Sequence, residues 1–327
     1  MAPKLKGKSF INTLEFTPAE LEFLLDRAKA IKKARGKKGK RPLDGRSVAL
    51  VFFNPSLRTR VSFEVGIAEL GGQAVTMSVG SESWSLEYKE NAVMDQDKTE
   101  HIKDAAQVLS RYVDAIAVRS FPSLKSYDED MADPVITSFR KYSKVPVINM
   151  ESALWHPCQA MADALTVQEK YGRIKGRKVT LTWAYHPKAL PMAVGNSFAA
   201  IMSQLGADLT IAHPPEFALP GTFLDSLPRA PKIVHSKEEG LNGAEVVYAK
   251  SWGGASYYGK WEEEKKLREG LKSWICDSVP KGATFMHCLP VRRNVEVADA
   301  VLDSSAIYDE AENRLHVQKA ILSELLA

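Results

Sequence analysis

Apolar runs alternate with segments of helical period along almost the whole chain. The apolar run Ser47–Asn54 predicts a buried strand, and Thr59–Leu70 predicts a helix that ends at two glycines. In that helix the pattern places Val61, Val65 and Ala68 on one face. Further elements expected in the first half are a helix at His101–Ser110 and strands at Gln73–Val79, Ala115–Arg119 and Val145–Met150. This order of strands and helices is typical of an open, mostly parallel sheet.

The same alternation restarts in the second half, after a long helix expected at Cys158–Tyr171. Its elements are helices at Pro191–Leu205 and Glu312–Leu326 and strands at Lys178–Tyr185, Ala207–His213, Val246–Lys250 and Ala283–Cys288. We therefore predict an α/β fold with two doubly wound parallel-sheet domains joined by long helices. The expected domains are residues 1–153 and 154–327, and the closing helix, at about 312–326, is expected to pack back on the first domain.

Composition narrows the class of protein. The 327 residues are 45% apolar and 26% charged, which is typical of a soluble globular protein, and the net charge of +4 is too small to indicate nucleic acid. No apolar run approaches the ~20 residues that span a bilayer, and the basic segment Met1–Ser9 lacks the apolar stretch of a secretory signal. The cysteines Cys158, Cys276 and Cys288 suit neither a disulfide framework nor a zinc site, so we expect a protein of the reducing cytoplasm, and we expect no metal.

Basic residues gather in one segment, Lys29–Arg46. No aromatic residues interleave with them, so the pattern favours a solvated helix end and loop over a site for polyanions. The residues of this basic segment include Lys32, Lys33, Arg35, Lys37, Lys38, Lys40 and Arg41.

The stretch Phe53–Arg60 (FNPSLRTR) carries the most informative chemistry. It lies between a predicted strand and a helix start, where free backbone N–H groups and the positive helix end favour an anion. Ser56 and Thr59 add hydroxyl donors, and the planar guanidinium of Arg58 suits phosphate oxygens. Burying two arginines, Arg58 and Arg60, around one hydroxyl is unfavourable without an anion to neutralise them.

An ordinary helix cap explains only part of this stretch. A Ser or Thr cap stabilises a helix by about 1 kcal/mol, which accounts for Ser56 or Thr59 but not for the neighbouring arginines. The chain lacks the glycine pattern of a Walker loop, and the turn His186–Pro191 after a predicted strand lacks the dinucleotide fingerprint, which argues against a nicotinamide dehydrogenase. His186 and His213, each before a proline, are expected to be turn residues.

At this stretch the sequence resembles the aspartate/ornithine carbamoyltransferase family, whose signature is Ser-x-Arg-Thr-Arg. Three further motifs follow in the family's order, so the resemblance covers essentially the whole chain: Val118–Phe121 (VRSF), His156–Gln159 (HPCQ) and His287–Pro290 (HCLP). The resemblance implies an enzyme, a carbamoyltransferase, that needs no cofactor.

Within the family, the chain resembles the branch that uses N-acylated ornithine. The segments that carry this resemblance are Leu181–Pro187, Tyr248–Trp252 and Cys288–Asn294. The motif whose Asp binds the free α-amine in ornithine enzymes is absent, and Lys250 lies in the corresponding stretch. Acylation removes the charge of the α-amine and leaves a carboxylate and an amide, which a cation suits better than an acid.

The resemblance implies transfer of the carbamoyl group from carbamoyl phosphate to the δ-amine of N-acetyl-L-ornithine, giving N-acetyl-L-citrulline and phosphate in arginine biosynthesis. Arg119, His156 and Cys288 are the implied catalytic residues, and the leaving phosphate is expected to accept the amine proton. The implied carbamoyl phosphate site consists of Ser56, Leu57 through its backbone, Arg58, Thr59, Trp84, Arg119, His156, Gln159, Cys288, Leu289 and Arg314. The implied amino-acid site consists of Glu151, Lys250, Leu289, Arg292 and Thr99.

In the family, the polar loop that contains Trp84 reaches into a neighbouring subunit's site, so the resemblance implies a homotrimer with shared active sites. The expected partners are therefore the two substrates and identical subunits, with neither nucleic acid nor a membrane.

Features that separate acetyl from succinyl users point both ways. Thr99 lies where acetyl enzymes carry Glu and succinyl enzymes carry Pro. Leu315–Ala320 resembles the acetyl enzymes, whereas Leu190-Pro191 and Pro290–Arg293 resemble the succinyl enzyme. We favour the acetyl substrate, with N-succinylornithine and ornithine as alternatives. Glu296 lies where some relatives have Lys. A non-catalytic phosphate-binding paralogue is disfavoured because the motifs of both halves are intact.

Overall fold

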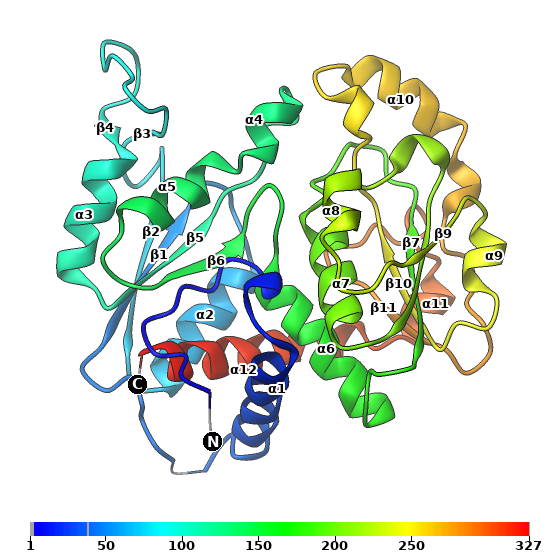
Figure 1. Ribbon diagram of the computed structural model, residues 1–327, viewed down its shortest axis with the longest axis horizontal. Helices are drawn as coiled ribbons and strands as arrows, with labels where there is room; N and C mark the ends of the chain where they lie inside the picture. The colour runs from blue at the N-terminus through cyan, green and yellow to red at the C-terminus, as the bar shows by residue number, and fades with distance from the viewer. Residues whose placement is uncertain (1–2, 38, 327) are drawn as a thin grey trace. The chain divides into compact units, whose positions relative to one another are not determined.

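The computed structural model describes residues 3–37 and 39–326 (Figure 1). The outer ends of the two expected domains, residues 1 and 327, and Lys38 of the basic segment lie outside the described residues. Contacts divide the chain into two compact units. Unit 1 comprises 1–122, 128–158 and 314–327, and unit 2 comprises 123–127 and 159–313. The chain passes between the units within α6 (Pro157–Tyr171) and α12 (Ile307–Leu326) and at either end of the short segment 123–127.

Unit 1 is built on a four-stranded parallel sheet with the order β2-β1-β5-β6. The strands β1 and β5 are apolar along most of their length because both faces of the central strands are covered. Phe52 pairs in register with Arg119, and Arg119 with Glu151, so three strands end at the same edge. The strands are β1 (Ser47–Phe52), β2 (Gln73–Ser78), β5 (Ala115–Arg119) and β6 (Val147–Glu151).

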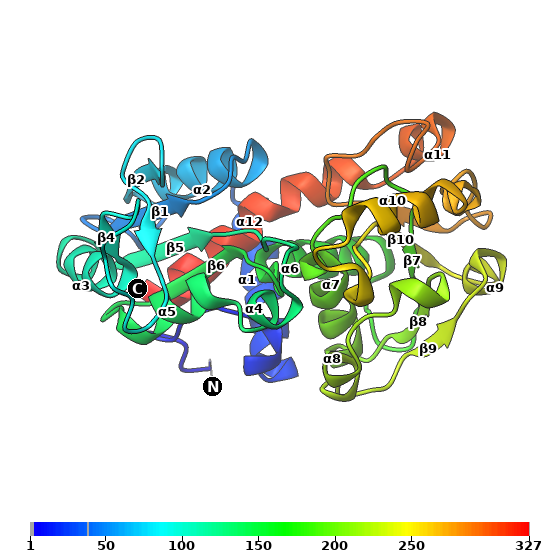
Figure 2. The ribbon, with the colours of Figure 1, turned by 90° about the horizontal axis from the view of Figure 1, so that it is seen from above.

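Helices α3 and α5 cover one face of this sheet, where their side chains join a core with those of β1 and β5 (Figure 2). A two-stranded parallel sheet of β3 and β4 lies beside α3. The remaining elements of unit 1 are η1 (Thr13–Glu15), α1 (Pro18–Lys33), α2 (Arg58–Glu69), β3 (Leu86–Glu87), β4 (Glu100–His101), α3 (Ile102–Tyr112), α4 (Tyr127–Met131) and α5 (Pro134–Tyr142).

The prediction missed α1, although its start has a readable signature. Thr17 accepts a hydrogen bond from the Glu20 N–H, and the Glu20 carboxylate accepts one from the Thr17 N–H. This capping box, followed by proline at the first turn and a buried face that includes Leu21 and Leu25, is typical of a helix N-terminus.

Helix α2 lies where the sequence predicts it, but its buried face differs from the predicted apolar face. Phe63 and Ile67 are buried, whereas Val61 and Val65 are 51% and 37% exposed. The periodicity identified an apolar stripe correctly but could not tell which of two stripes faces the core.

Unit 2 is built on a five-stranded parallel sheet with the order β11-β10-β7-β8-β9. Helix α9 packs against β7, β8 and β9 (Figure 2). The strands are β7 (Lys178–Trp183), β8 (Asp208–Ala212), β9 (Lys232–Val234), β10 (Val246–Lys250) and β11 (Thr284–Met286). The other elements are α7 (Ala193–Gln204), η2 (Pro215–Phe217), α8 (Gly221–Asp225), α9 (Lys237–Leu241), η3 (Ala255–Tyr257), α10 (Trp261–Glu269), η4 (Lys272–Trp274) and α11 (Asp299–Asp303).

The predicted fold class, α/β with two doubly wound parallel sheets and long connecting helices, is confirmed. Helix α12 begins at Ile307, five positions before the expected Glu312. Within residues 3–37 and 39–326, no helix combines the length and the apolar character needed to cross a bilayer.

Candidate active site

The predicted phosphate loop of unit 1 connects β1 to α2. The Thr59 N–H donates to Ser56 Oγ at 3.2 Å, so Ser56 caps the helix start. Leu57 lies at the N-cap with its side chain 74% exposed and makes no side-chain cap. The first turn of α2, which is fully described, contains no acidic residue, so the positive end of the helix is available to an anion.

Arginine side chains from two segments of unit 1 converge on Thr59. Arg314 Nη2 of α12 donates to Thr59 Oγ1 at 2.6 Å, and Arg119 Nη1 of β5 lies 3.4 Å from the same oxygen. Burial lowers the pKa of Arg314, and the nearby charges of Arg119 and Arg58 lower it further. The hydroxyl that the sequence places in the loop therefore lies at the centre of a group of guanidinium ions.

A carboxylate and an imidazole complete this cluster. Arg119 Nη1 lies 2.5 Å from Glu151 Oε2, and His156 Nε2 lies 3.4 Å from the same oxygen. All three side chains are buried. The Nε–H groups of Arg119 and Arg314 are buried and have no partner among the described residues. Since one carboxylate faces two guanidinium groups, those of Arg119 and Arg314, the cluster has excess positive charge and unused donors for an anion.

The expectation for Arg60 is wrong. Its side chain is exposed, and its Nε pairs with Glu64 Oε1 at 3.0 Å, one turn along α2. The guanidinium groups that reach Thr59 come instead from Arg119 and Arg314, which lie far away in the sequence.

Two predicted site residues of unit 1, Trp84 and Thr99, lie outside the cluster around Thr59. Trp84 is 56% exposed, and its Nε1–H donates to Glu100 Oε2 at 2.5 Å. Thr99 is exposed, next to Glu100 on the segment that carries β4. Neither residue has a described bond to Thr59, Arg119 or Arg314.

Asp133 orders the loop that connects Glu151 to His156. Its carboxylate accepts hydrogen bonds from the Ser152 hydroxyl and from the N–H groups of Ala153 and Leu154. Burial raises the pKa of Asp133 to about 6, and these hydrogen bonds oppose the rise. Asp133 itself has a φ of 45°, a left-handed conformation that Asp tolerates better than most residues. Nothing in the sequence pattern pointed to this role.

In unit 2, the predicted amino-acid residues lie at strand ends and in the loop after β11. Lys250 is the last residue of β10 and is buried. Arg292 Nε donates to His186 Nε2 at 3.2 Å, and the Arg292 N–H donates to Glu296 Oε2 at 2.8 Å. Glu296 is 1% exposed, and burial raises its pKa while the charges of Lys250 and Arg292 oppose the rise.

His186 lies in the loop that follows β7, and it also orients Arg292. Arg292 Nε donates to His186 Nε2, so in the neutral ring Nδ1 carries the proton and faces the Lys188 carbonyl oxygen at 2.9 Å. Burial lowers the pKa of His186 to about 4, and the charges of Lys250, Arg292 and Arg268 add to this effect. The imidazole is therefore neutral at pH 7. His213 directly follows β8, and its Nδ1 lies 2.7 Å from the Pro214 carbonyl oxygen.

The loop of Cys288 and Leu289 is supported by two buried carboxylates. Glu310 accepts hydrogen bonds from Gln159 Nε2 and from the His287 N–H, at 2.8 and 2.9 Å. Asp163 accepts the second bond of the Gln159 amide, at 2.8 Å. Leu289 has a φ of 54°, and its N–H donates to His287 Nδ1. Gln159 is thus linked through Glu310 to the predicted loop, a connection that the sequence motifs did not reveal.

Arg268 is a second residue that the sequence prediction missed. It is 1% exposed and pairs with Glu264. Its Nη1 donates to the His186 carbonyl and to Ser251 Oγ, and its Nη2 donates to the Trp252 carbonyl. Arg268 therefore connects the loop after β7 to the loop after β10, the strand that ends at Lys250.

The described residues contain no group of three or more His, Cys, Asp or Glu side chains that is suited to a metal ion. Besides the carboxylates of Glu151 and Glu296, the functional groups described in each unit are guanidinium, ammonium, imidazole, hydroxyl and amide groups, which are the kinds of group that can bind anions and stabilise a developing oxyanion.

Comparison with known proteins gives consistent matches over both units. Residues 8–169 match the model of the aspartate/ornithine carbamoyltransferase carbamoyl-P binding domain, and residues 191–325 match that of the Asp/Orn binding domain. The chain is 46% identical to an N-acetylornithine carbamoyltransferase of Xanthomonas campestris pv. campestris over 335 aligned residues, which cover 98% of each chain. It is 37% identical to an N-succinylornithine carbamoyltransferase of Bacteroides thetaiotaomicron, covering 86% of this chain and 87% of the relative.

A solved structure of acetylornithine transcarbamylase complexed with acetylcitrulline has a TM-score of 0.94 to this chain at 44% identity, covering 98% of this chain and 99% of the other. Together with the two matched domains, this likeness decides the family. The chain belongs to the aspartate/ornithine carbamoyltransferase family.

Proposed function

We propose that this enzyme transfers the carbamoyl group of carbamoyl phosphate to the δ-amine of N-acetyl-L-ornithine, forming N-acetyl-L-citrulline and phosphate as a step of arginine biosynthesis. The observation that carries the proposal is the cluster around Thr59. There, Arg314 and Arg119 approach one hydroxyl beside a helix start, with Glu151 as the nearby carboxylate. A phosphate dianion supplies the negative charge that this cluster lacks.

The proposed roles in unit 1 follow from this charge distribution. Ser56, the Leu57 backbone, Arg58 and Thr59 bind the phosphate, and Arg314 donates to it from α12. Arg119 and His156 donate to the carbamoyl oxygen, where negative charge grows as the tetrahedral intermediate forms. Glu151 holds both of these donors, which fits a positioning role better than the substrate contact that the sequence suggested.

The neutral δ-amine attacks the carbamoyl carbon, and the carbon–oxygen bond to phosphate then breaks. Phosphate leaves as a stable anion and accepts the amine proton, so no covalent nucleophile and no side-chain base are needed. The enzyme contributes position and electrostatic stabilisation. Gln159 and the loop of Cys288 and Leu289 bind the carbamoyl amide in this proposal.

Lys250 and Arg292 are the proposed partners of the amino acid's carboxylate. Both are cations of unit 2, and a substrate without a charged α-amine needs no acidic partner beside them. The names of the more similar relatives favour acetyl over succinyl, since identity is 46% to the first and 37% to the second. The proposed roles also divide the chain by substrate. Residues 1–153 are proposed as the carbamoyl phosphate domain and residues 154–327 as the amino-acid domain, except that the end of α12 belongs to the first domain.

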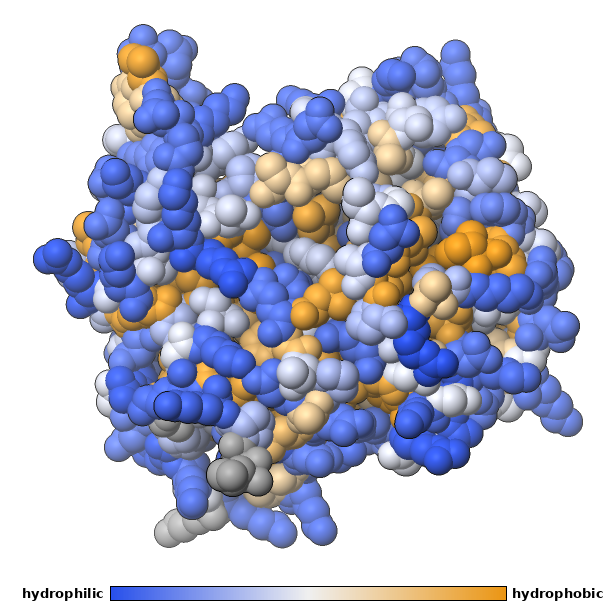
Figure 3. All heavy atoms as spheres, viewed as in Figure 1, coloured by the Kyte–Doolittle hydropathy of each residue, from blue (hydrophilic) through white to orange (hydrophobic). Residues whose placement is uncertain are grey.

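A homotrimer with shared active sites is part of this proposal. Val61 and Val65 form an exposed apolar stripe on α2 with Leu57, which suits burial against a second copy of the chain. The loop between β3 and β4 has an apolar tip, visible in Figure 3, where Val93 and Met94 are exposed. In the trimer, the segment with Trp84 and Thr99 contacts the neighbouring subunit's site. Native mass spectrometry tests this: a monomer at micromolar concentration contradicts it.

A reducing cytoplasm is the proposed compartment. Cys158, Cys276 and Cys288 are all described, and each is a buried thiol that forms no disulfide. Burial raises the pKa of Cys158 and of Cys276 to about 12, so both stay protonated and unreactive at neutral pH.

The decisive experiment is steady-state turnover with carbamoyl phosphate and each of three acceptors: N-acetyl-, N-succinyl- and free ornithine. We expect the highest kcat/KM for N-acetylornithine, measured by the release of phosphate and by the ureido product. Faster use of N-succinylornithine or of ornithine contradicts the proposed acceptor but leaves the carbamoyl phosphate site intact.

The phosphate site is tested separately by Arg58→Ala. We expect weaker binding of carbamoyl phosphate with an unchanged circular dichroism spectrum. Arg60→Ala is the matched control because Arg60 is exposed and paired with Glu64. Unchanged affinity in Arg58→Ala, or an equal loss in both variants, removes Arg58 from the site.

A further inference from the structure

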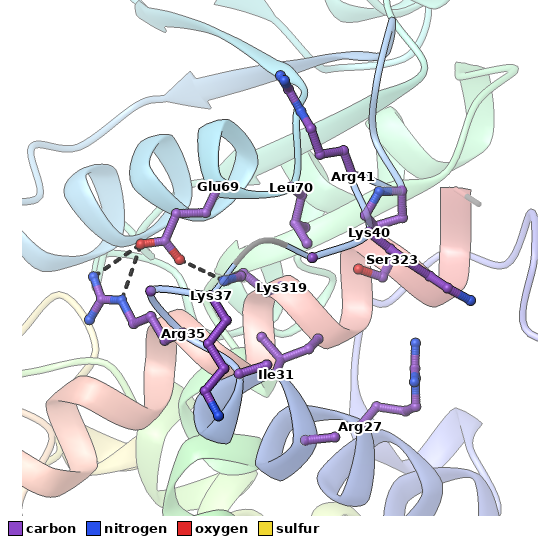
Figure 4. A pocket seen from close by; sticks show the side chains of 15 residues that line it. Arg27, Ile31, Arg35, Lys37, Lys40, Arg41, Glu69, Leu70, Lys319 and Ser323 are labelled. Carbon is purple, nitrogen blue, oxygen red and sulfur yellow. Dashed lines mark hydrogen bonds and ion pairs between the residues drawn. The ribbon is translucent and has the colours of Figure 1, made fainter.

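A second cationic site lies in unit 1, at the opposite end of α2 from the phosphate loop. A cavity of about 770 Å³ lies between the end of α1, the loop that follows it, and the helices α2 and α12 (Figure 4). Glu69, the last residue of α2, lines this cavity, whereas Arg58 begins the helix. Twelve helical residues span about 17 Å, so the cavity is separate from the Thr59 cluster.

The lining of this cavity is strongly cationic. One carboxylate, Glu69, serves two cations: its Oε1 accepts from Arg35 Nε at 3.1 Å and its Oε2 from Lys319 Nζ at 2.6 Å (Figure 4). In the described part of the chain, the ammonium groups of Lys37 and Lys40 have no acidic partner. The six lining cations are Arg27, Arg35, Lys37, Lys40, Arg41 and Lys319.

Ion pairs of two lining residues, Arg27 and Arg41, neutralise only part of the positive charge around the cavity. Arg27 pairs with Glu324 at 2.6 Å, and Arg41 lies 3.8 Å from Asp44, with both members of the second pair exposed. Exposed pairs of this kind stabilise by at most about 1 kcal/mol. Arg27, Arg35, Lys37, Lys40 and Arg41 are exposed to solvent, and their combined positive field attracts an anion with several charges.

The floor of the cavity is apolar. Ile31 and Ala34 line it from the end of α1, and Leu70 from the end of α2. Ser323 of α12 also lines it, and its buried hydroxyl has no hydrogen-bond partner among the described residues. The volume lies within the range of about 300–1,000 Å³ that small-molecule sites occupy. An apolar floor with cations on several sides suits a phosphorylated organic molecule.

We propose that this cavity binds a small molecule with two or more phosphate groups, and that its occupancy changes the affinity of the Thr59 cluster for carbamoyl phosphate. The sequence favoured a solvated helix end and loop here, because the order of residues along the chain does not show which distant residues lie beside this segment. Folding places them opposite Lys319, a residue about 280 positions away.

The coupling rests on the proposed function and on the contacts between α2 and α12. Hydrogen bonds join both ends of α2 to the middle of α12, by Glu69 with Lys319 beside the cavity and by Thr59 with Arg314 in the cluster. Between these bonds the helices pack closely: a methyl group on Gly66 would lie 3.2 Å from Lys319 Cγ. A polyphosphate competes with Glu69 for Arg35 and Lys319, which loosens one end of a rigidly packed pair. By linkage, each ligand then changes the affinity of the other by the same factor.

The test is isothermal titration calorimetry with inorganic triphosphate and the full-length chain. We expect one saturable site per chain, weakened at least about tenfold by the double variant Lys37→Glu/Lys40→Glu. The matched control is Lys265→Glu/Lys266→Glu, which reverses two exposed charges of α10 in unit 2 and is expected to change nothing. Arg58→Ala is expected to retain triphosphate binding. Adenosine triphosphate replaces the inorganic probe to measure the contribution of the apolar floor.

The outcomes separate the alternatives. Binding that is lost in Arg58→Ala but kept in Lys37→Glu/Lys40→Glu means that triphosphate occupies the phosphate loop, and it overturns the proposed site. Equal weakening in both double variants means non-specific attraction and overturns it as well, as does the absence of binding. A carbamoyl phosphate affinity that is the same with and without saturating triphosphate overturns the coupling. None of these measurements needs turnover, so they stand apart from the identity of the amino-acid substrate.

Discussion

Arg119 and Glu151 are register partners on the neighbouring strands β5 and β6, and their side chains form a buried ion pair of 2.5 Å. The pair lies at the strand ends, where the ladder shifts between Val118 and Arg119. The same Glu151 oxygen also faces His156, so one carboxylate holds two of the proposed oxyanion donors. Because other guanidinium groups lie nearby, this carboxylate is central to the charge balance of unit 1.

Replacing Glu151 with Gln tests that balance. The substitution conserves size but leaves the Arg119 guanidinium without its counter-charge. We expect the free energy of unfolding to fall by about 3–5 kcal/mol, as for other broken buried pairs. Inorganic phosphate is expected to raise the unfolding temperature more in Glu151→Gln than in the native chain, because the anion replaces the missing charge. Differential scanning fluorimetry checks this, and equal shifts in both proteins contradict it.

The Thr59 hydroxyl is expected to position Arg314. Thr59→Val keeps the shape of the side chain but removes the acceptor of the Arg314 bond. A buried donor left without its partner costs about 1–3 kcal/mol, so we predict lower stability and a higher KM for carbamoyl phosphate. Thr59→Ser retains the hydroxyl and is expected to recover most of both properties. A valine variant with native KM shows that the hydroxyl is dispensable for binding.

The low pKa of His186 predicts a pH dependence of stability. The unfolded chain binds this proton below about pH 6.5, whereas the folded chain binds it only below about 4. Between these values the unfolded state holds more protons, so the free energy of unfolding falls as the pH is lowered from about 6.5 to 4. Urea titrations of the native chain and of His186→Gln measure this contribution as a difference. A difference that stays constant over this pH range argues against a neutral, buried imidazole.

Two substitutions of Glu296 separate its charge from its hydrogen bond. Glu296→Gln keeps an acceptor for the Arg292 N–H but removes the negative charge near Lys250 and Arg292. We expect a lower KM for the amino acid, because its carboxylate no longer competes with Glu296 for these cations. Glu296→Ala also loses the acceptor, so the loop loosens and the KM rises, by about tenfold for a loss of ~1.4 kcal/mol. Changes of the same sign in both variants contradict this division.

Asp133 offers a test of how the Glu151–His156 loop is held. Asp133→Ala leaves the N–H groups of Ala153 and Leu154 without their acceptor. We predict a loss of stability of about 1–3 kcal/mol and a fall in kcat that exceeds any rise in the KM for carbamoyl phosphate. The reason is that the loop orients His156 while the phosphate groups stay in place. Steady-state kinetics below the unfolding temperature checks this, and a change confined to KM contradicts it.

The sequence by itself determined the two parallel sheets, because buried parallel strands are continuous apolar runs and their crossover helices have a different period. It also located the loop with Ser56, Arg58 and Thr59, since strand, loop and helix start are adjacent in the chain. The order of the remaining motifs identified the family. Each of these features depends on neighbouring residues or on the order of segments along the chain, and both can be obtained from the sequence.

The tertiary structure alone decided which charges neutralise one another. Arg314 reaches Thr59 across 255 positions, whereas Arg60, one position from Thr59, pairs with Glu64 at the surface. Helix α2 carries two apolar stripes, and only packing against α12 and the sheet decides which stripe is buried. Ionic partners and buried faces depend on register and on helices that are distant in sequence, so periodicity cannot predict them. For the same reason, the sequence predicted only a solvated helix end and loop for the basic segment, whereas the structure shows that this segment and Lys319 line one cavity.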